Sequence, residues 1–254
     1  MASTRSIRPT IRLVAVTVLL LIGCGTPVFA EEQAAEPLPT PRWPDGRPNL
    51  GSAPGAVGYW EIRPGGGGGI GYPRADDLPL QPWARALMEY RGSIDDLYPP
   101  SVNCVPTGGP GFFNSPGFEI VDVPDLEKIF ITNIAGPHSW RVIYMDGREH
   151  PEDLRPTYFG HSIGRWEGDM LVVDTVGFNE KSWIRGSIPT TSRLRMIERI
   201  TRPNLQTINY EATFEDPGAL TAPYTGGWEI NLTTGSSWIA DGEAFEYICQ
   251  DSRL

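Results

Sequence analysis

Hydrophobic and polar residues alternate in short runs from about residue 118 onward, which is the pattern of half-buried β-strands. Turn-forming Asp, Gly, Pro and Asn residues separate the runs. We therefore expect an all-β fold, an antiparallel meander that closes into a lipocalin-like barrel, with a β-sandwich as the alternative. The predicted strands are Phe118–Val123, Lys128–Ile134, Trp140–Met145, Phe159–Trp166, Asp169–Val176, Leu194–Thr201, Gln206–Phe214, Trp228–Leu232 and Glu243–Cys249.

The beginning of the chain follows a different pattern. Three arginines precede the apolar run Leu13–Ile22, which is too short to span a bilayer and is typical of a secretory signal. Residues 1–30 are therefore expected to be a signal peptide. Two processing sites compete: ordinary cleavage after Ala30, and lipidation of Cys24 at the end of a sequence that resembles a bacterial lipoprotein box. Both predict a periplasmic or secreted protein, and the second predicts a lipid anchor in the outer membrane.

Residues 31–100 are rich in proline and glycine, and only Gln81–Tyr90 is predicted to form a short amphipathic helix. Several aromatic residues in this segment indicate an arm that packs on the main domain. Residues 101–254 are expected to form that domain, the antiparallel β domain.

Charge and cysteine content narrow the function classes. The formal net charge is −10, so a general phosphate-binding surface for nucleic acid is not expected. Only Cys104 and Cys249 follow the signal segment, and a lone pair in an oxidising compartment predicts a disulfide. A nucleophilic thiol or a metal ligand is the alternative, although neither cysteine lies in a CxxC motif.

The segment 160–178 is the strongest candidate for chemistry. It is predicted to be a hairpin with a two-residue turn at Glu167-Gly168, which places His161 directly opposite Asp174. Such a pair would orient the imidazole and raise its pKa. We therefore expect His161 to be the catalytic acid or base, Asp174 its orienting partner, and Arg165 an anion or oxyanion stabiliser.

One face of this hairpin mixes charged and apolar side chains, which suits a ligand cavity. The alternative is that the same face is the solvated outer surface of the sheet. The predicted substrate-binding residues, on this face and on neighbouring strands, are Trp140, Ile163, Met170, Val172 and Asn209.

Glu198 is a second candidate acid or base. If the following turn centres on Pro203-Asn204, Glu198 faces Asn209, and Tyr210 points to the opposite face. The alternative is a surface charge ladder of Glu198 with its neighbouring arginines.

No motif indicates a metal, a cofactor or a serine nucleophile. The other histidines, His138 and His150, lie in predicted loops without HxH or HExxH spacing. Residues 160–164 (GHSIG) only superficially resemble the G-x-S-x-G motif, because they lead into a hairpin rather than a helix. We therefore expect no metal and no cofactor.

Several segments together resemble a family of secreted bacterial proteins, largely uncharacterised, with a GHSIGRWEGD-type hairpin motif. The resemblance implies export and an important hairpin, and it implies no particular reaction. That family commonly carries a histidine shortly before the Glu-Arg pair, where this chain has Thr190-Thr191, which weakens any three-histidine site. The matching segments are Pro41-Arg42, 45–50 (DGRPNL), 104–106 (CVP), 146–151 (DGREHP), 160–169 (GHSIGRWEGD), Glu198-Arg199, Asp216-Pro217 and 247–249 (YIC).

Together these patterns predict an exported enzyme that performs cofactor-free acid–base chemistry, as a lyase, isomerase or hydrolase, on a small apolar or aromatic molecule in a barrel cavity. The first alternative is a periplasmic binding or carrier protein for an apolar ligand, with His161 outside the cavity. The second is an envelope structural protein without a cavity.

Overall fold

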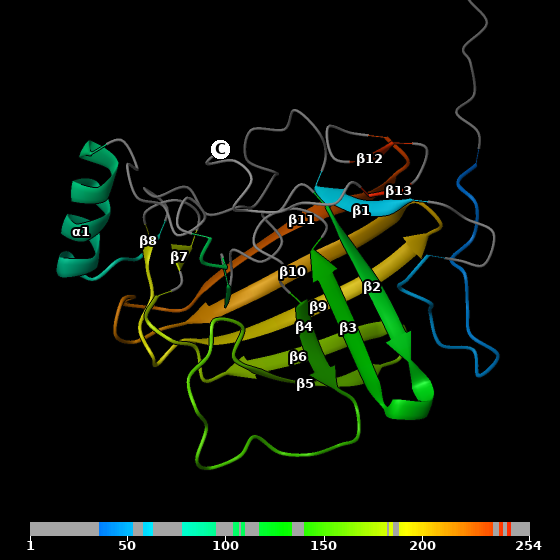
Figure 1. The fold of residues 1–254 in the computed structure, drawn as a ribbon, viewed down its shortest axis with the longest axis horizontal. Coiled ribbons are helices and arrows are strands. Elements are labelled where there is room, and N and C mark those ends of the chain that lie inside the picture. The colour runs from blue at the N-terminus through cyan, green and yellow to red at the C-terminus, as the bar shows by residue number, and fades with distance from the viewer. Residues whose placement is uncertain are drawn as a thin grey trace, which may run out of the picture. The chain divides into compact units, whose positions relative to one another are not determined.

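Nine strands form a closed barrel in the computed structural model (Figure 1). The structure describes residues 36–52, 58–62, 78–94, 104–106, 108–109, 117–133, 140–181, 183–184, 188–235, 239–240 and 243–244. The barrel strands are β1 Tyr59–Ile62, β2 Phe118–Val123, β3 Lys128–Asn133, β4 Trp140–Tyr144, β5 His161–Glu167, β6 Met170–Val176, β9 Arg195–Asn204, β10 Thr207–Glu215 and β11 Tyr224–Thr233.

The strand order around the barrel is β1-β11-β10-β9-β6-β5-β4-β3-β2, and pairing of β1 with β2 closes it. The predicted closed barrel is thereby confirmed. The prediction that all neighbouring strands are antiparallel was wrong, because β4 and β5 are parallel. Parallel neighbours need a long connection that returns along the sheet. Here residues 145–160 provide it, as the long loop between β4 and β5 in Figure 1.

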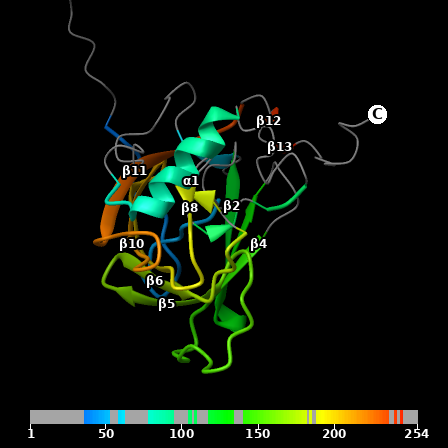
Figure 2. The same cartoon turned by 90° about the vertical axis from the view of Figure 1, so that its left-hand side faces the viewer.

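Short elements flank the barrel. Helix α1, Pro82–Ser93, begins with a proline that its first turn tolerates, and it lies beside β8 (Figure 2). A 3-10 turn spans Pro124–Leu126 between β2 and β3. The two small two-stranded sheets are β7 Trp183–Ile184 with β8 Ile188–Pro189, and β12 Ile239–Ala240 with β13 Glu243–Ala244. None of the helices among the described residues has the length and apolar character needed to cross a membrane.

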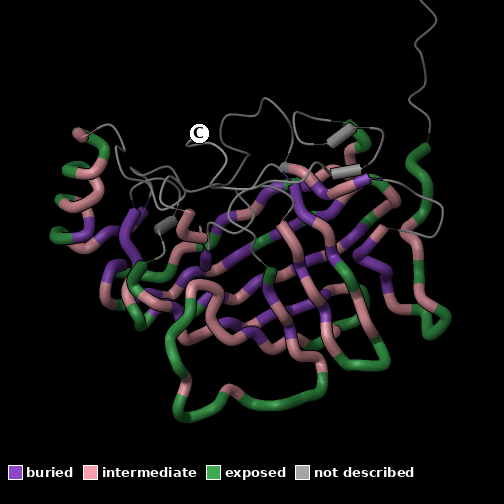
Figure 3. The backbone as a smooth tube through the Cα atoms, viewed as in Figure 1, coloured by how far each residue is buried: buried purple, intermediate pink, exposed green. Residues whose placement is uncertain are grey.

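The barrel interior is packed with side chains. Buried and less buried residues alternate along β9 and β10, as the period of a strand requires, and the alternation is visible along the tubes in Figure 3. The apolar inward residues of these strands belong to one cluster, whereas the inward Glu198 and Arg202 of β9 are charged. The largest members of the cluster from the strands, each at most 2% exposed, are Trp60, Phe118, Phe214, Ile129, Ile131, Ile143 and Leu171.

The segment before the β domain contributes one barrel strand and several contacts with the other strands and their loops. β1, which lies within the segment expected to be an arm, is a barrel strand between β2 and β11. Arg42 forms an ion pair with Asp169 in the β5–β6 loop. Arg202 donates to the backbone carbonyl of Asn49, and its guanidinium lies 4.7 Å from the ring centroid of Trp60. These contacts connect residues 42–49 to strands far away in the sequence.

A buried ion pair crosses the interior. Both terminal nitrogens of Arg141 donate to the carboxylate of Glu198, with Nη1 2.9 Å from Oε1. Arg141 also donates to Ser162 Oγ (3.0 Å) and Thr175 Oγ1 (2.9 Å), and the Tyr210 hydroxyl donates to Glu198 Oε1 (2.9 Å). These five side chains come from β4, β5, β6, β9 and β10, so the cluster joins five strands, including the parallel pair.

This pair yields a stability prediction. Arg141→Met leaves the Glu198 carboxylate buried without its cation, which we expect to cost about 3–5 kcal/mol of unfolding free energy. The double variant Arg141→Met/Glu198→Leu should recover most of that loss, since no charge is left buried. Urea unfolding measures both. Arg165→Ala serves as the control, because Arg165 pairs with Glu167 in an exposed ion pair and such pairs contribute little. If the buried single variant loses no more stability than this control, the interpretation is wrong.

Candidate functional site

The predicted hairpin exists as β5–β6, but its register differs from the expected one. The loop residues are Gly168 and Asp169, so Glu167 pairs with Met170. Gly168, with φ of 61°, occupies the first loop position, where two-residue hairpins favour glycine. Direct opposition of His161 and Asp174 was therefore wrong. His161 pairs with Val176, and Asp174 pairs with Ile163.

The observed partner of His161 is Val176, two residues beyond the expected Asp174. A register shift by an even number of residues keeps side chains on their face of the sheet, so His161 and Asp174 still share one face. That face is the outer wall of the barrel, while Ser162 and Thr175 point inward. It is not bulk solvent, however, because both His161 and Asp174 are only partly exposed. The outer-surface alternative is thus correct about the face, and the two side chains are nevertheless half-buried.

A third residue joins the two candidates. His150, in the loop before β5, places its Nδ1 2.8 Å from the Nδ1 of His161. The buried Nε2 of His150 lies 3.8 Å from Oδ1 of Asp174. Arg195 on β9 fixes the Asp174 carboxylate through two hydrogen bonds of 3.0 and 2.6 Å. The order in space is therefore Asp174, His150, His161, which we call the histidine chain.

The environment favours neutral imidazoles and an ionised carboxylate. Burial lowers the pKa of His161, and the neighbouring charges of His150 and Arg148 lower this pKa further. Burial also lowers the pKa of His150, against an opposing effect of Asp174. Burial alone would raise the pKa of Asp174, but the hydrogen bonds and charge of Arg195 outweigh it and leave the pKa lowered.

The charge of Asp174 favours one pair of tautomers in the histidine chain, although its distance of 3.8 Å from His150 Nε2 is too long for a hydrogen bond. A neutral imidazole has one N–H and one lone pair. Asp174 favours the N–H of His150 on Nε2, which makes His150 Nδ1 an acceptor. The hydrogen bond between the two rings then requires the N–H of His161 on Nδ1. With this pair of tautomers, the lone pair of His161 lies on Nε2.

His161 also lines a cavity of about 390 Å³ in the barrel wall between β4 and β5, which we call the wall cavity. Pairing of β4 with β5 is recorded only at Ile143 with Ser162 and at Tyr144 with Ile163, and the cavity lies beside the earlier part of both strands. The ring of Tyr144 stacks on His161 at 5.2 Å. The lining residues among those described are Trp140, Arg141, Val142, Tyr144, Thr157, Phe159, Gly160, His161 and Ser162.

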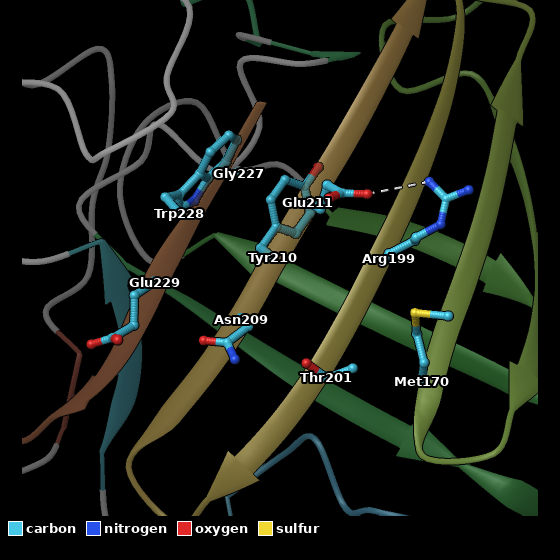
Figure 4. A pocket seen from close by; sticks show the side chains of 9 residues that line it. All are labelled: Met170, Arg199, Thr201, Asn209, Tyr210, Glu211, Gly227, Trp228 and Glu229. Atoms are coloured by element: carbon cyan, nitrogen blue, oxygen red, sulfur yellow. Dashed lines mark hydrogen bonds and ion pairs between the residues drawn. The ribbon is translucent and has the colours of Figure 1, made fainter. Parts of the chain in front are cut away.

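A second cavity of about 510 Å³ lies on the outer wall, over β6, β9, β10 and β11 (Figure 4). Met170 and Asn209, predicted to bind substrate with His161, line this cavity instead. Arg199 and Glu211 form an ion pair of 3.5 Å across it. It shares no lining residue with the wall cavity beside β4.

Glu198 does not face Asn209 as expected. The β9–β10 loop is centred on residues 205–206, and a register irregularity follows between Thr207 and Asn209. Glu198 therefore pairs with Ala212, and Asn209 pairs with Thr201. An odd displacement moves side chains to the other face, so the expectation that Tyr210 and Glu198 lie on opposite faces was also wrong. The surface charge ladder was wrong for Glu198, which is 0% exposed.

The remaining predicted residues are distributed differently. Trp140 lines the wall cavity and is 60% exposed. Arg165 is exposed and donates to Glu167, and neither Arg165 nor the buried Val172 is among the described lining residues of either cavity. Ile163 lies opposite Asp174 and lines neither.

Several candidates lie outside the described part of the chain. Cys24, His138 and Cys249 are not described, so the disulfide of Cys104 with Cys249 and lipidation of Cys24 stay predictions. Within the described residues, no group of three or more His, Cys, Asp or Glu residues is arranged to hold a metal ion.

Sequence reasoning missed two features of the site. His150 was placed in a loop and left out of the predicted site, and its contact with His161 was not foreseen. Arg141 was missed although it lies two residues before the apolar Ile143 in a predicted strand, so both side chains are on the same, inward face.

Comparison with protein-family models, curated proteins and solved structures finds no match for the chain. The resemblance to secreted bacterial proteins therefore stays a prediction, and the function has to be argued from the wall cavity and the histidine chain themselves.

The histidine chain predicts the titration of its members. We expect His150 and His161 both to titrate below the ordinary value of 6.5, mainly because burial disfavours their charged forms. Asp174→Asn should lower the pKa of His150 further, since the carboxylate charge supports its protonation. Imidazole NMR signals measured against pH, assigned with His150→Gln and His161→Gln, provide the test. Titration of either ring at or above 6.5 in the wild type contradicts the described environment.

Proposed function

We propose that the protein is an exported enzyme that performs acid–base chemistry on a small aromatic molecule in the wall cavity. One observation carries the proposal: His161 lines a cavity of ligand size while its Nδ1 is held by His150. Cavities of about 300–1,000 Å³ are typical of small-molecule sites. A lipocalin-like use of the barrel as a ligand scaffold is part of the proposal, with the wall rather than the packed interior as the binding place.

In this proposal His161 Nε2 is the general base. It takes a proton from the substrate, or from a water that attacks the substrate, and becomes an imidazolium. The Nδ1–H of that imidazolium donates to His150, and the carboxylate of Asp174 stabilises the added charge through His150. The same proton returns to the product from Nε2, so lyase, isomerase and hydrolase reactions all fit without a cofactor.

Binding without catalysis is the alternative function, and the position of His161 separates the two. A carrier for an apolar ligand requires only the aromatic lining, and we expected its cavity to exclude His161. Instead, His161 lines the cavity, has a lowered pKa and is oriented by two further residues. A neutral, oriented imidazole has a use in proton transfer and none in simple apolar binding, which supports the enzyme.

We further propose that the protein acts outside the cytoplasm. Two observations support this location. The chain begins with arginines followed by an apolar run, as secretory signals do. Cys104 and Cys249 form a lone pair of cysteines after that segment, which is typical of a disulfide in an oxidising compartment. The resemblance to secreted bacterial proteins points in the same direction.

Removal of the base is the first test of the proposed function. With 4-nitrophenyl acetate as an aromatic reporter, we expect His161→Ala to lower kcat/KM by about 10²–10⁴-fold, the usual contribution of a general base. The wild-type rate should rise with pH through the lowered pKa of His161 and level off above it, because only the neutral form accepts a proton. Thr213→Ala is the control, since Thr213 bonds Thr225 on the exposed wall. An unchanged rate in His161→Ala, with an unchanged melting temperature, contradicts the proposal.

Export and the cysteine pairing are tested together by mass spectrometry. The mature protein from a bacterial periplasm should begin at Glu31 or at a lipidated Cys24, and its unreduced digest should contain a peptide that links Cys104 to Cys249. An unprocessed N-terminus would contradict the signal peptide. Quantitative alkylation of Cys104 without a reductant would contradict the disulfide.

A further inference from the structure

The long loop between β4 and β5 is attached to the barrel wall through one side chain along part of its length. Residues 149–153 are all exposed except His150, which is half-buried. Within the part of the chain that the structure describes, the hydrogen bonds and ion pairs of this segment belong to His150. We call residues 149–153 the His150 strap, because the position of the segment on the wall depends on that imidazole.

The attachment depends on how many protons the two rings of the histidine chain carry. His150 Nδ1 lies 2.8 Å from His161 Nδ1, so one of these nitrogens donates and the other must keep a lone pair. A first added proton is compatible with this bond, because it can bind to an Nε2 atom. A second added proton fills all four ring nitrogens, and both rings are then donors only. The bond cannot exist in that state, and the rings, with centroids 5.0 Å apart, carry like charges.

Charged groups on several elements surround the two rings. Asp174 on β6 lies 3.8 Å from His150 Nε2 and supports its protonation. Arg195 on β9 already compensates this carboxylate through two hydrogen bonds, which limits the support. The other titratable or charged groups nearby are Tyr144 on β4, Lys128 on β3, Arg165 on β5, Glu215 on β10, Asp146 and Arg148 in the loop, and Glu149, Glu152 and Asp153 in the strap.

Protons favour the released strap over the attached one. In the attached state burial is the main cause that lowers the pKa of His150 and of His161. Release exposes His150 to water, where its pKa returns toward 6.5, so the released state binds protons more tightly. The attached state is therefore favoured above pH 6.5 and loses stability as the pH falls through the lowered pKa values.

We propose that the His150 strap is a proton-sensitive switch beside the wall cavity. When the two rings have bound two protons, the hydrogen bond between their Nδ1 atoms breaks and residues 149–153 leave the wall. His161, which lines the cavity, then loses the hydrogen-bond partner that orients its ring. This inference concerns the regulation of the site named in the proposed function, and it rests on that function only for its effect on catalysis.

Backbone ¹⁵N NMR relaxation, recorded as a function of pH, tests the switch. The amides of Glu149, His150 and Glu152 should have order parameters of about 0.85 while both rings are neutral, and below about 0.6 once both are protonated. Imidazole signals from the same samples report the protonation of each ring, and release should follow the second histidine to titrate. Residues 205–206, in the β9–β10 loop without a histidine, are the internal control and should stay unchanged.

His150→Asn separates the effect of the imidazoles from that of the acidic side chains in the strap. The amide oxygen of asparagine accepts a hydrogen bond from His161 Nδ1 and takes up no proton, so residues 149–153 should stay ordered after His161 is protonated. His150→Ala removes the acceptor and should release the strap at every pH.

Three results would overturn the switch. They are a wild-type strap that stays ordered with both rings protonated, release of the strap in His150→Asn at the same pH as in the wild type, and an ordered strap in His150→Ala. If a variant fails to fold, the wild-type pH series decides alone.

This test is independent of the proposed catalysis, because it measures backbone order and no rate. Release on double protonation, together with an unchanged rate in His161→Ala, would reject the enzyme and keep the switch. A strap that stays ordered, together with a lowered rate in His161→Ala, would reject the switch and keep the enzyme.

Discussion

The ion pair between Arg141 and Glu198 is the interaction on which the rest of the structure depends. It lies inside the barrel, and through Ser162, Thr175 and Tyr210 it connects five strands. Charges in such a place are costly unless each polar atom has a partner. The cluster supplies those partners in one arrangement, so it is compatible with one register of β4, β5, β6, β9 and β10. We expect this specificity, more than a net gain in stability, to be its main contribution.

The candidate site follows from the same constraint. Arg141 and Ser162 hold β4 and β5 together as parallel neighbours, although backbone pairing is recorded at only two positions. Beside that short pairing the wall contains a cavity that residues of both strands line, Arg141 and Ser162 among them. The loop of residues 145–160, which the parallel arrangement requires, brings His150 to His161. The cavity and the histidine chain are thus two consequences of one strand arrangement.

The sequence predicted the strands much better than their partners. β2 has the predicted bounds, because its alternation of apolar and polar residues is clear. Register depends instead on which residues form each loop. Gly168 is compatible with a loop at 167–168, as predicted, and with the observed loop at 168–169. The register irregularity between Thr207 and Asn209 has no counterpart in the pattern of apolar and polar residues. The contact of His150 with His161 depends on the path of a long loop without periodicity. Sequence reasoning therefore found His161 and Asp174 but not the residue between them.

The central claim is that Asp174, acting through His150, leaves the lone pair of His161 on Nε2. Long-range ¹H–¹⁵N NMR spectra of the imidazole rings, recorded above the pKa values of both histidines, measure this directly. The account predicts that His150 carries its proton on Nε2 and His161 on Nδ1. A protonated Nε2 on His161, or an even mixture of tautomers in either ring, would contradict it.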